Sequence, residues 1–313
     1  MIRIRNLTKK FGELYAVKNL NMDIGAGEIF GFIGPNGAGK TTTIRMLSTL
    51  LDPDEGTAWI DGYCIQTHQE EVRRKIGYMP DYFGVYEGVT VWEYLEFFAR
   101  AYKVPAKERN KIIDGCMALT DFTKLSSKLV STLSKGMTQR LCLAKTLLHD
   151  PKVLILDEPA SGLDPRARIE IRTLLKELSR MGKTIFLSSH ILTELADVVD
   201  SIGILEKGSM VVNGNLEAIS KAISSSSSSF TIFLSLFQGQ KKEQAKELLE
   251  KFPNILKIEI QGDRLEIQYA GKEEEIYQIL KHLTNHDIPI TGMSREEKNL
   301  EDIFMQLTKG EVS

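Results

Sequence analysis

Cysteine is scarce in this sequence. Only three cysteines, Cys64, Cys116 and Cys142, occur among 313 residues, and no two of them form a CxxC pair. This pattern argues against a disulfide framework and against a zinc site built on cysteine pairs. Buried, reduced thiols in a cytosolic protein explain such scattered cysteines best.

Long hydrophobic runs are also missing. No stretch approaches the roughly 18 apolar residues that a membrane-spanning helix needs. The charged residues 1–12 contain no apolar core of a signal peptide. The sequence therefore predicts no membrane span of its own, and work at a membrane would require another polypeptide to supply the spanning helices.

Neither sign of charge is in excess. Lys and Arg number 40 and Asp and Glu number 42, which leaves a formal net charge of -2. A dedicated surface for DNA or RNA needs an excess of positive charge. We therefore expect no nucleic-acid partner.

The length is sufficient for two domains, at about 150 residues per domain. Six consecutive serines occupy 224–229. Serine runs cannot bury apolar surface and are typical of flexible linkers. We expect a first domain over 1–223, a linker over 224–229 and a small α+β domain over 230–313.

Buried strands and helices alternate in the first domain. The apolar runs Ile29–Ile33, Val153–Leu156 and Thr184–Leu187 predict buried strands. A helical pattern over Ala167–Met181 separates the last two, and this order predicts a parallel α/β sheet. Residues from about 85 to 150 have a mostly helical pattern.

The residues after the serine run predict a smaller mixture of elements. Strands are expected at 231–237, on both sides of Gly262 and near 288–290, and helices at 241–252, 272–285 and 300–307.

A glycine-rich loop follows the first buried strand. It reads Gly34-Pro35-Asn36-Gly37-Ala38-Gly39-Lys40-Thr41 and matches the G-x-x-x-x-G-K-[ST] pattern of phosphate-binding loops. Glycines let the backbone N–H groups turn toward phosphates, and the next helix adds its N-terminus. Lys40 is expected to reach the β- and γ-phosphates and Thr41 to bind Mg²⁺. Alone, this loop fits kinases, GTPases and motor ATPases equally well.

Two acids close the second buried strand. Asp157 and Glu158 follow Leu156, at the strand end where open α/β sheets bind ligands. Asp157 is expected to hold Mg²⁺ directly or through its water, and Glu158 to polarise the attacking water. His190 follows the third strand and is expected to sense or stabilise the γ-phosphate charge.

A further motif lies before the acidic strand, and it identifies the family. Leu133-Ser134-Lys135-Gly136-Met137 opens a predicted helix, whose N-terminus can bind an anion. In this order after a phosphate loop, the motifs of residues 1–220 resemble the ATP-binding cassette (ABC) family. The resemblance implies a P-loop cassette with a parallel-sheet core, an antiparallel β subdomain and an α-helical subdomain.

The resemblance also implies roles for individual residues. Phe11 would stack on adenine beside Val17, and Thr42 would add a phosphate contact. Ser161-Gly162-Leu163-Asp164 matches the D-loop. Ser134 and Gly136 would contact the γ-phosphate of ATP bound to a second subunit in a head-to-tail dimer, homomeric or heteromeric.

Two positions depart from the family pattern. The signature usually reads LSGGQ, whereas Lys135 and Met137 replace Gly and Gln here. Asp81 stands where the Q-loop normally has Gln. Asp81 either approaches Mg²⁺ or only begins the loop. Both variants resemble an efflux-type subfamily with a C-terminal extension.

The expected function is that of an ATPase subunit. Such a subunit binds ATP and Mg²⁺ and powers export through a separate membrane permease, at the cytoplasmic face of the membrane. The alternative is a soluble ABC-type ATPase that acts on ribosomes or DNA. The chain contains one cassette and no CxxC metal site, which disfavours that alternative. The pattern of the C-terminal unit leaves dimerisation, regulation and permease contact open.

Overall fold

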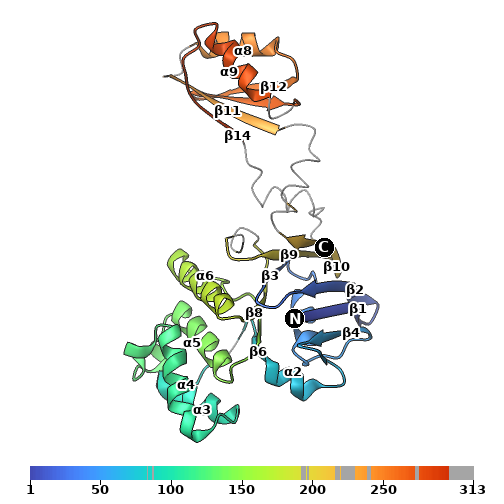
Figure 1. Ribbon diagram of the computed structural model, residues 1–313, viewed down its shortest axis with the longest axis vertical. Helices are drawn as coiled ribbons and strands as arrows, with labels where there is room; N and C mark the ends of the chain where they lie inside the picture. The colour runs from blue at the N-terminus through green and yellow to red at the C-terminus, as the bar shows by residue number, and fades with distance from the viewer. Residues whose placement is uncertain are drawn as a thin grey trace. The chain divides into compact units, whose positions relative to one another are not determined.

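The computed structural model describes residues 1–82, 84–86, 88–191, 195, 197–215, 219, 230–237, 241–271 and 275–295. The chain divides into two compact units near residue 216, and each is described by itself (Figure 1). Within the described residues, no helix has the length and apolar character to cross a membrane.

The first unit is built on a six-stranded sheet, in the order β10-β9-β3-β8-β7-β6. All neighbours are parallel except β10, which pairs antiparallel with β9. The bounds are β3 (Ile29–Ile33), β6 (Ile76–Met79), β7 (Val153–Leu156), β8 (Thr184–Ser189), β9 (Ser201–Glu206) and β10 (Ser209–Asn215). Every residue of β3, β7 and β8 is buried, as expected for central strands covered on both faces.

A second sheet lies against this core and is antiparallel, in the order β2-β1-β4-β5. Its strands are β1 (Ile2–Phe11), β2 (Leu14–Ile24), β4 (Glu55–Ile60) and β5 (Tyr63–Cys64). Alternate residues of β1 and β2 pack into the core cluster that also holds Phe30, Phe32 and Phe186. This is the antiparallel β subdomain that the resemblance implied.

Helices complete the first unit. They are α1 (Lys40–Leu47), α2 (Gln69–Lys75), α3 (Val91–Ala101), α4 (Ala106–Leu119), α5 (Lys135–Leu147) and α6 (Pro165–Arg180). Figure 1 shows α3, α4 and α5 grouped on the side away from the antiparallel sheet. A capping box begins α3, because Thr90 and Glu93 each accept a backbone N–H of the other. The predicted α-helical subdomain is present.

The second unit is a four-stranded antiparallel sheet in the order β12-β13-β11-β14. It contains β11 (Phe230–Leu236), α8 (Lys242–Glu250), β12 (Ile255–Gln261), β13 (Arg264–Tyr269), α9 (Ile276–Thr284) and β14 (Ile290–Arg295). Apolar residues of both helices and of the sheet form its own core cluster. The predicted small α+β unit is confirmed.

Several expected elements differ from the observed ones. The helix after the phosphate loop, where residues 42–51 have a helical pattern, runs from Lys40 to Leu47. The strand expected near 288–290 begins at Ile290, after the buried Ile288. The strands β4, β5, β6, β9 and β10 were not predicted. The serine run at 224–229 and the expected helix at 300–307 lie outside the described residues.

Candidate functional site

The glycine-rich loop joins the carboxyl end of β3 to the first turn of α1. Its backbone passes close to other backbone: a Cβ on Gly34 would lie 2.3 Å from the carbonyl oxygen of Leu205, and one on Gly39 would lie 2.2 Å from that of Ala16. Gly39 also has φ of 105°, in the region that favours glycine. These contacts explain why the loop needs glycine at both positions.

Lys40 is the first residue of α1 and is only 6% exposed. Its ammonium donates hydrogen bonds to the carbonyl oxygens of Gly34 (2.7 Å) and Pro35 (3.1 Å). It also lies 3.6 Å from Oε1 of Glu158. Burial lowers the pKa of Lys40, and the negative charge of Glu158 opposes that shift.

The two acids differ in their surroundings. Asp157 is 1% exposed, and one of its oxygens accepts a 2.6 Å hydrogen bond from the Ser188 hydroxyl. The same hydroxyl accepts a 2.9 Å hydrogen bond from the backbone N–H of Glu158. Ser188, on β8, therefore sets the position of both residues at the end of β7.

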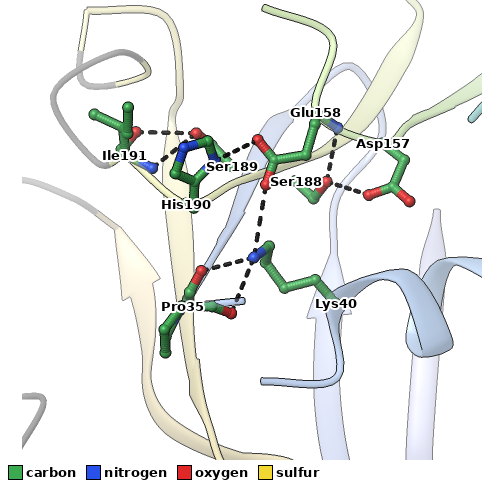
Figure 2. A network of polar contacts seen from close by, with 9 residues as sticks. Pro35, Lys40, Asp157, Glu158, Ser188, Ser189, His190 and Ile191 are labelled. Atoms are coloured by element: carbon green, nitrogen blue, oxygen red, sulfur yellow. Dashed lines mark hydrogen bonds and ion pairs between the residues drawn. The ribbon is translucent and has the colours of Figure 1, made fainter. Parts of the chain in front are cut away.

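The Glu158 carboxylate lies between the Lys40 ammonium and the His190 imidazole (Figure 2). Its Oε2 lies 2.9 Å from Nδ1 of His190, while Oε1 faces Lys40. The phosphate loop, the strand end of β7 and the residue after β8 thus meet at one carboxylate. Parallel strands place their carboxyl ends at one edge of a sheet, which is why residues so far apart in the sequence meet here.

The signature residues open α5. Ser134 is the N-cap, and its hydroxyl accepts a hydrogen bond from the N–H of Met137. Gly136 packs against α6, since a Cβ there would lie 2.8 Å from the Cβ of Ala167. Ser134 and Lys135 are exposed. Leu133 is half-buried.

The D-loop residues connect β7 to α6. Ser161 donates its N–H to the carbonyl oxygen of Glu158 (3.1 Å), and Leu163 is buried. Asp164 caps α6 by accepting from the N–H of Ala167 (3.0 Å). Gly162 has φ of 63°.

Asp81 follows β6 after Pro80 and is exposed. Desolvation raises the pKa of Asp81, and the carboxylates of Asp157 and Glu158 add to the rise, while Lys135 and His190 oppose it. The residue that departs from the family pattern therefore lies within the electrostatic field of the site.

The residues expected to contact the nucleotide differ in how far they are exposed. Phe11 is 54% exposed at the end of β1, so its ring can receive a stacked base. Val17 is 0% exposed and belongs to the core cluster. Thr41 is exposed and Thr42 is half-buried, both in the first turn of α1.

Two contributors went unassigned at the level of sequence. Ser188 contacts both Asp157 and Glu158, and nothing in the sequence pattern singles it out. Gln139, on α5, donates a 2.8 Å hydrogen bond from its side chain to the carbonyl oxygen of Pro159, beside Glu158. A polar residue on the buried face of a helix is the one signal that could have indicated Gln139.

The residues present fit a nucleotide with a hydrated cation. A buried lysine beside a loop of glycines suits phosphate, and Thr41 with Asp157 offers the hydroxyl and carboxylate oxygens that Mg²⁺ prefers. Among the described residues no group of three or more His, Cys, Asp or Glu side chains could hold a metal. A cation here would thus depend on phosphate and water for its other ligands.

Comparisons with known proteins show which family the chain is similar to. The model of the "ABC transporter" family matches residues 17–161, and that of the "ATP-binding protein DrrA1-3-like, C-terminal domain" matches residues 225–308. An uncharacterized ABC transporter ATP-binding protein of Bacillus subtilis, YhcH, is 36% identical, with 98% of this chain and 96% of the relative covered. The bacitracin transport ATP-binding protein BcrA of Bacillus licheniformis is 34% identical over 99% and 98% of the two chains.

A solved structure is similar to the first unit. It is a dimeric, post-hydrolysis state of an ATP-binding cassette bound to ADP and Pi. The identity is 30% and the TM-score 0.61, with 69% of this chain and 99% of that chain covered.

Proposed function

The chain belongs to the ABC transporter family of ATP-binding proteins, and from this premise we propose that it powers export through a separate membrane permease. It is an ATPase subunit. The alternative of a soluble ATPase that acts on ribosomes or DNA is not favoured, because relatives along nearly the whole chain are transport and export subunits.

The observation that carries the proposal is the meeting of Lys40, Glu158 and His190 at one point. Lys40 binds the β- and γ-phosphates as its contact with Glu158 is exchanged for phosphate oxygen. Glu158 then accepts a proton from the attacking water, and His190 stabilises the charge on the γ-phosphate. Mg²⁺, held by Thr41 and Asp157, would neutralise charge on the phosphates.

The remaining residues bind and orient the nucleotide. Residues 34–41 wrap the phosphates with backbone N–H groups, and Thr42 adds a contact. Phe11 stacks on adenine. Val17 is buried in the core, so it would support the adenine site from below the surface and not through an exposed side chain.

We propose that the working form is a dimer of ATPase subunits. Ser134 and Gly136 at the start of α5 contact the γ-phosphate of ATP bound to the partner, and residues 161–164 lie at the same interface. Support comes from the exposure of Ser134 and from the dimeric state of the similar solved cassette. ATP then joins the subunits and hydrolysis releases them.

The partner and location follow from the same proposal. The permease supplies the spanning helices, and this subunit lies on the cytoplasmic face of the membrane. Names such as bacitracin transport and Nod factor export, which belong to relatives, support outward transport. We propose that residues 1–223 form the ATPase domain, 224–229 the linker and 230–313 an accessory domain.

The test combines turnover with capture of the partner. The tagged chain is expected to hydrolyse ATP and to bring down a polytopic membrane protein in near-stoichiometric yield from membranes solubilised in mild detergent. The control is the same chain with Lys40→Ala, which should lose turnover. Capture of ribosomal or DNA-associated proteins alone would contradict the export proposal.

A further inference from the structure

Phe11 lies at a point where the strand pairing gives little support. The pairing of β1 with β2 shifts register on both sides of Lys9, just before the ring. On the other side of β1, the last partner on β4 is Glu55, opposite Thr8. Register shifts interrupt the ladder of hydrogen bonds and let a strand bend. The position of Phe11 therefore depends on contacts outside the ladder as well.

Asp54 supplies such contacts from the position just before β4. Its N–H donates a hydrogen bond to the carbonyl oxygen of Thr8 (2.9 Å), and its Oδ2 accepts one from the N–H of Lys10 (2.7 Å). Its Oδ1 accepts a 2.8 Å hydrogen bond from the Lys9 ammonium. Asp54 thus holds three successive residues of β1, close before Phe11.

The Lys9 ammonium is held by two acceptors and lies over the Phe11 ring. Besides Asp54, it donates a 2.8 Å hydrogen bond to the carbonyl oxygen of Asp52. The Lys9 side chain is only 14% exposed, and its Nζ lies 5.9 Å from the centroid of the Phe11 ring. At such a distance a cation is attracted to the face of an aromatic ring. The ammonium thus takes one face of the ring, and a stacked base would use the opposite face.

We propose that the Lys9–Asp54 pair positions Phe11 for the nucleobase: Asp54 holds the ammonium in place, and the ammonium holds the ring. Both are positioning residues, because each acts on the base through Phe11. The inference rests on the proposed stacking of adenine on Phe11 and deepens it. An ion pair with an exposed partner adds little to the stability of a fold, and the Asp54 side chain is 43% exposed. The effect of the pair is therefore expected in the affinity for the base.

The test compares a ligand that has a base with one that has none. ADP and pyrophosphate, each with Mg²⁺, are titrated into the full chain by isothermal calorimetry. Lys9→Met keeps the length of the side chain and removes its charge, and it should raise the Kd for ADP by roughly 3- to 10-fold. The Kd for pyrophosphate should change by less than about twofold, because the phosphate loop is untouched. Equal losses for both ligands, or no loss for ADP, would overturn the proposal.

A double-mutant cycle tests whether Lys9 acts through the ring. Phe11→Ala should by itself weaken ADP binding, since the base loses its stacking partner. In the Phe11→Ala background, Lys9→Met should then change the Kd for ADP by less than about twofold. If the effects of the two substitutions multiplied instead, Lys9 would act independently of Phe11 and the proposal would be wrong.

Two further variants and a control separate charge from packing. Asp54→Asn removes the charge that holds the ammonium and should raise the Kd for ADP as Lys9→Met does, whereas Lys9→Arg keeps the cation and should restore most of the affinity. The matched control is Lys152→Met, which breaks another Lys–Asp pair, with Asp61 at 2.9 Å. Lys152 precedes β7 and so lies at the end of that strand away from the nucleotide. A loss of ADP affinity in Lys152→Met equal to that in Lys9→Met would contradict the inference.

These titrations also separate the inference from the proposed function. A chain that captures no permease would remove the export proposal, and the ADP titrations would still decide the role of Lys9, since binding of ADP requires neither a permease nor hydrolysis. If Phe11→Ala left the Kd for ADP unchanged, the stacking of adenine on Phe11 would be wrong, and this inference with it.

Discussion

Glu158 shows how much one side chain can depend on its neighbours. One oxygen faces Lys40, the other faces His190, and its backbone N–H is held by Ser188. Each partner comes from a different element. These contacts orient the carboxylate, as the general base proposed above requires.

Replacing Glu158 by Gln should abolish most turnover while leaving ATP binding intact. The amide keeps the shape of the carboxylate but cannot accept the water proton, so kcat should fall by at least about 100-fold. ATP-bound dimers should then accumulate and be visible by size-exclusion chromatography. Glu70→Gln, on the exposed face of α2, is the control. Turnover at the parental rate would remove Glu158 from the role of base.

Ser188→Ala should weaken both stability and catalysis. It removes the hydrogen bond to the buried Asp157 carboxylate, and an unsatisfied buried acceptor costs about 1–3 kcal/mol. Urea unfolding should show that loss, and kcat should fall with it. Ser189→Ala, whose hydroxyl bonds Ile191 instead, is the comparison on the same strand. If the two variants lost the same stability and the same kcat, the hydrogen bond from Ser188 to Asp157 would have no special role at the site.

At the scale of elements, the position of α5 depends on two contacts with the core. Gly136 allows its first turn to approach Ala167 on α6, and Gln139 reaches the carbonyl oxygen of Pro159. One contact is steric and the other is a buried hydrogen bond. Together they hold the signature residues in a fixed relation to the loop that follows Glu158.

Two helical glycines should respond in opposite directions to alanine. Gly136→Ala forces a methyl group into the α5–α6 contact and should destabilise the fold by about 1–3 kcal/mol. Gly115→Ala, in α4 with nothing within 4 Å of its Cβ, should instead stabilise it by about 0.5–1 kcal/mol through helix propensity. Urea midpoints measure both. A destabilised Gly115→Ala variant would contradict the explanation.

At the scale of the molecule, the two units have separate hydrophobic cores. The first contains every proposed nucleotide contact. The second has its own helices on its own sheet, with Leu234, Leu265 and Ile279 fully buried in it. Independent cores predict independent unfolding.

Calorimetry should therefore show two transitions, of which nucleotide raises only one. ADP at 100 times its Kd stabilises the state that binds it by about 2.7 kcal/mol, so the transition of the first unit should move upward. The transition of the second unit should not move. Lys40→Ala should cancel the shift. A single transition, or an equal shift of both, would contradict this division.

The sequence alone determined the central strands and the local loop chemistry. Apolar runs such as Val153–Leu156 indicate buried strands whatever surrounds them, and a pattern of glycines with Lys40 needs only a strand before it and a helix after it. The same local logic indicated the mostly helical pattern of residues 85–150, where α3, α4 and α5 lie.

Only the tertiary structure decided which residues meet. The strands β4 and β5 carry mixed residues whose burial depends on pairing, of β4 with β1 and of β5 with β4, so their pattern was too weak to predict them. The bridging role of Ser188 and the burial of Val17 depend on side chains that are distant in the chain. Local preference acts through near neighbours, whereas these contacts exist only after parallel strands have brought their ends to one edge of the sheet.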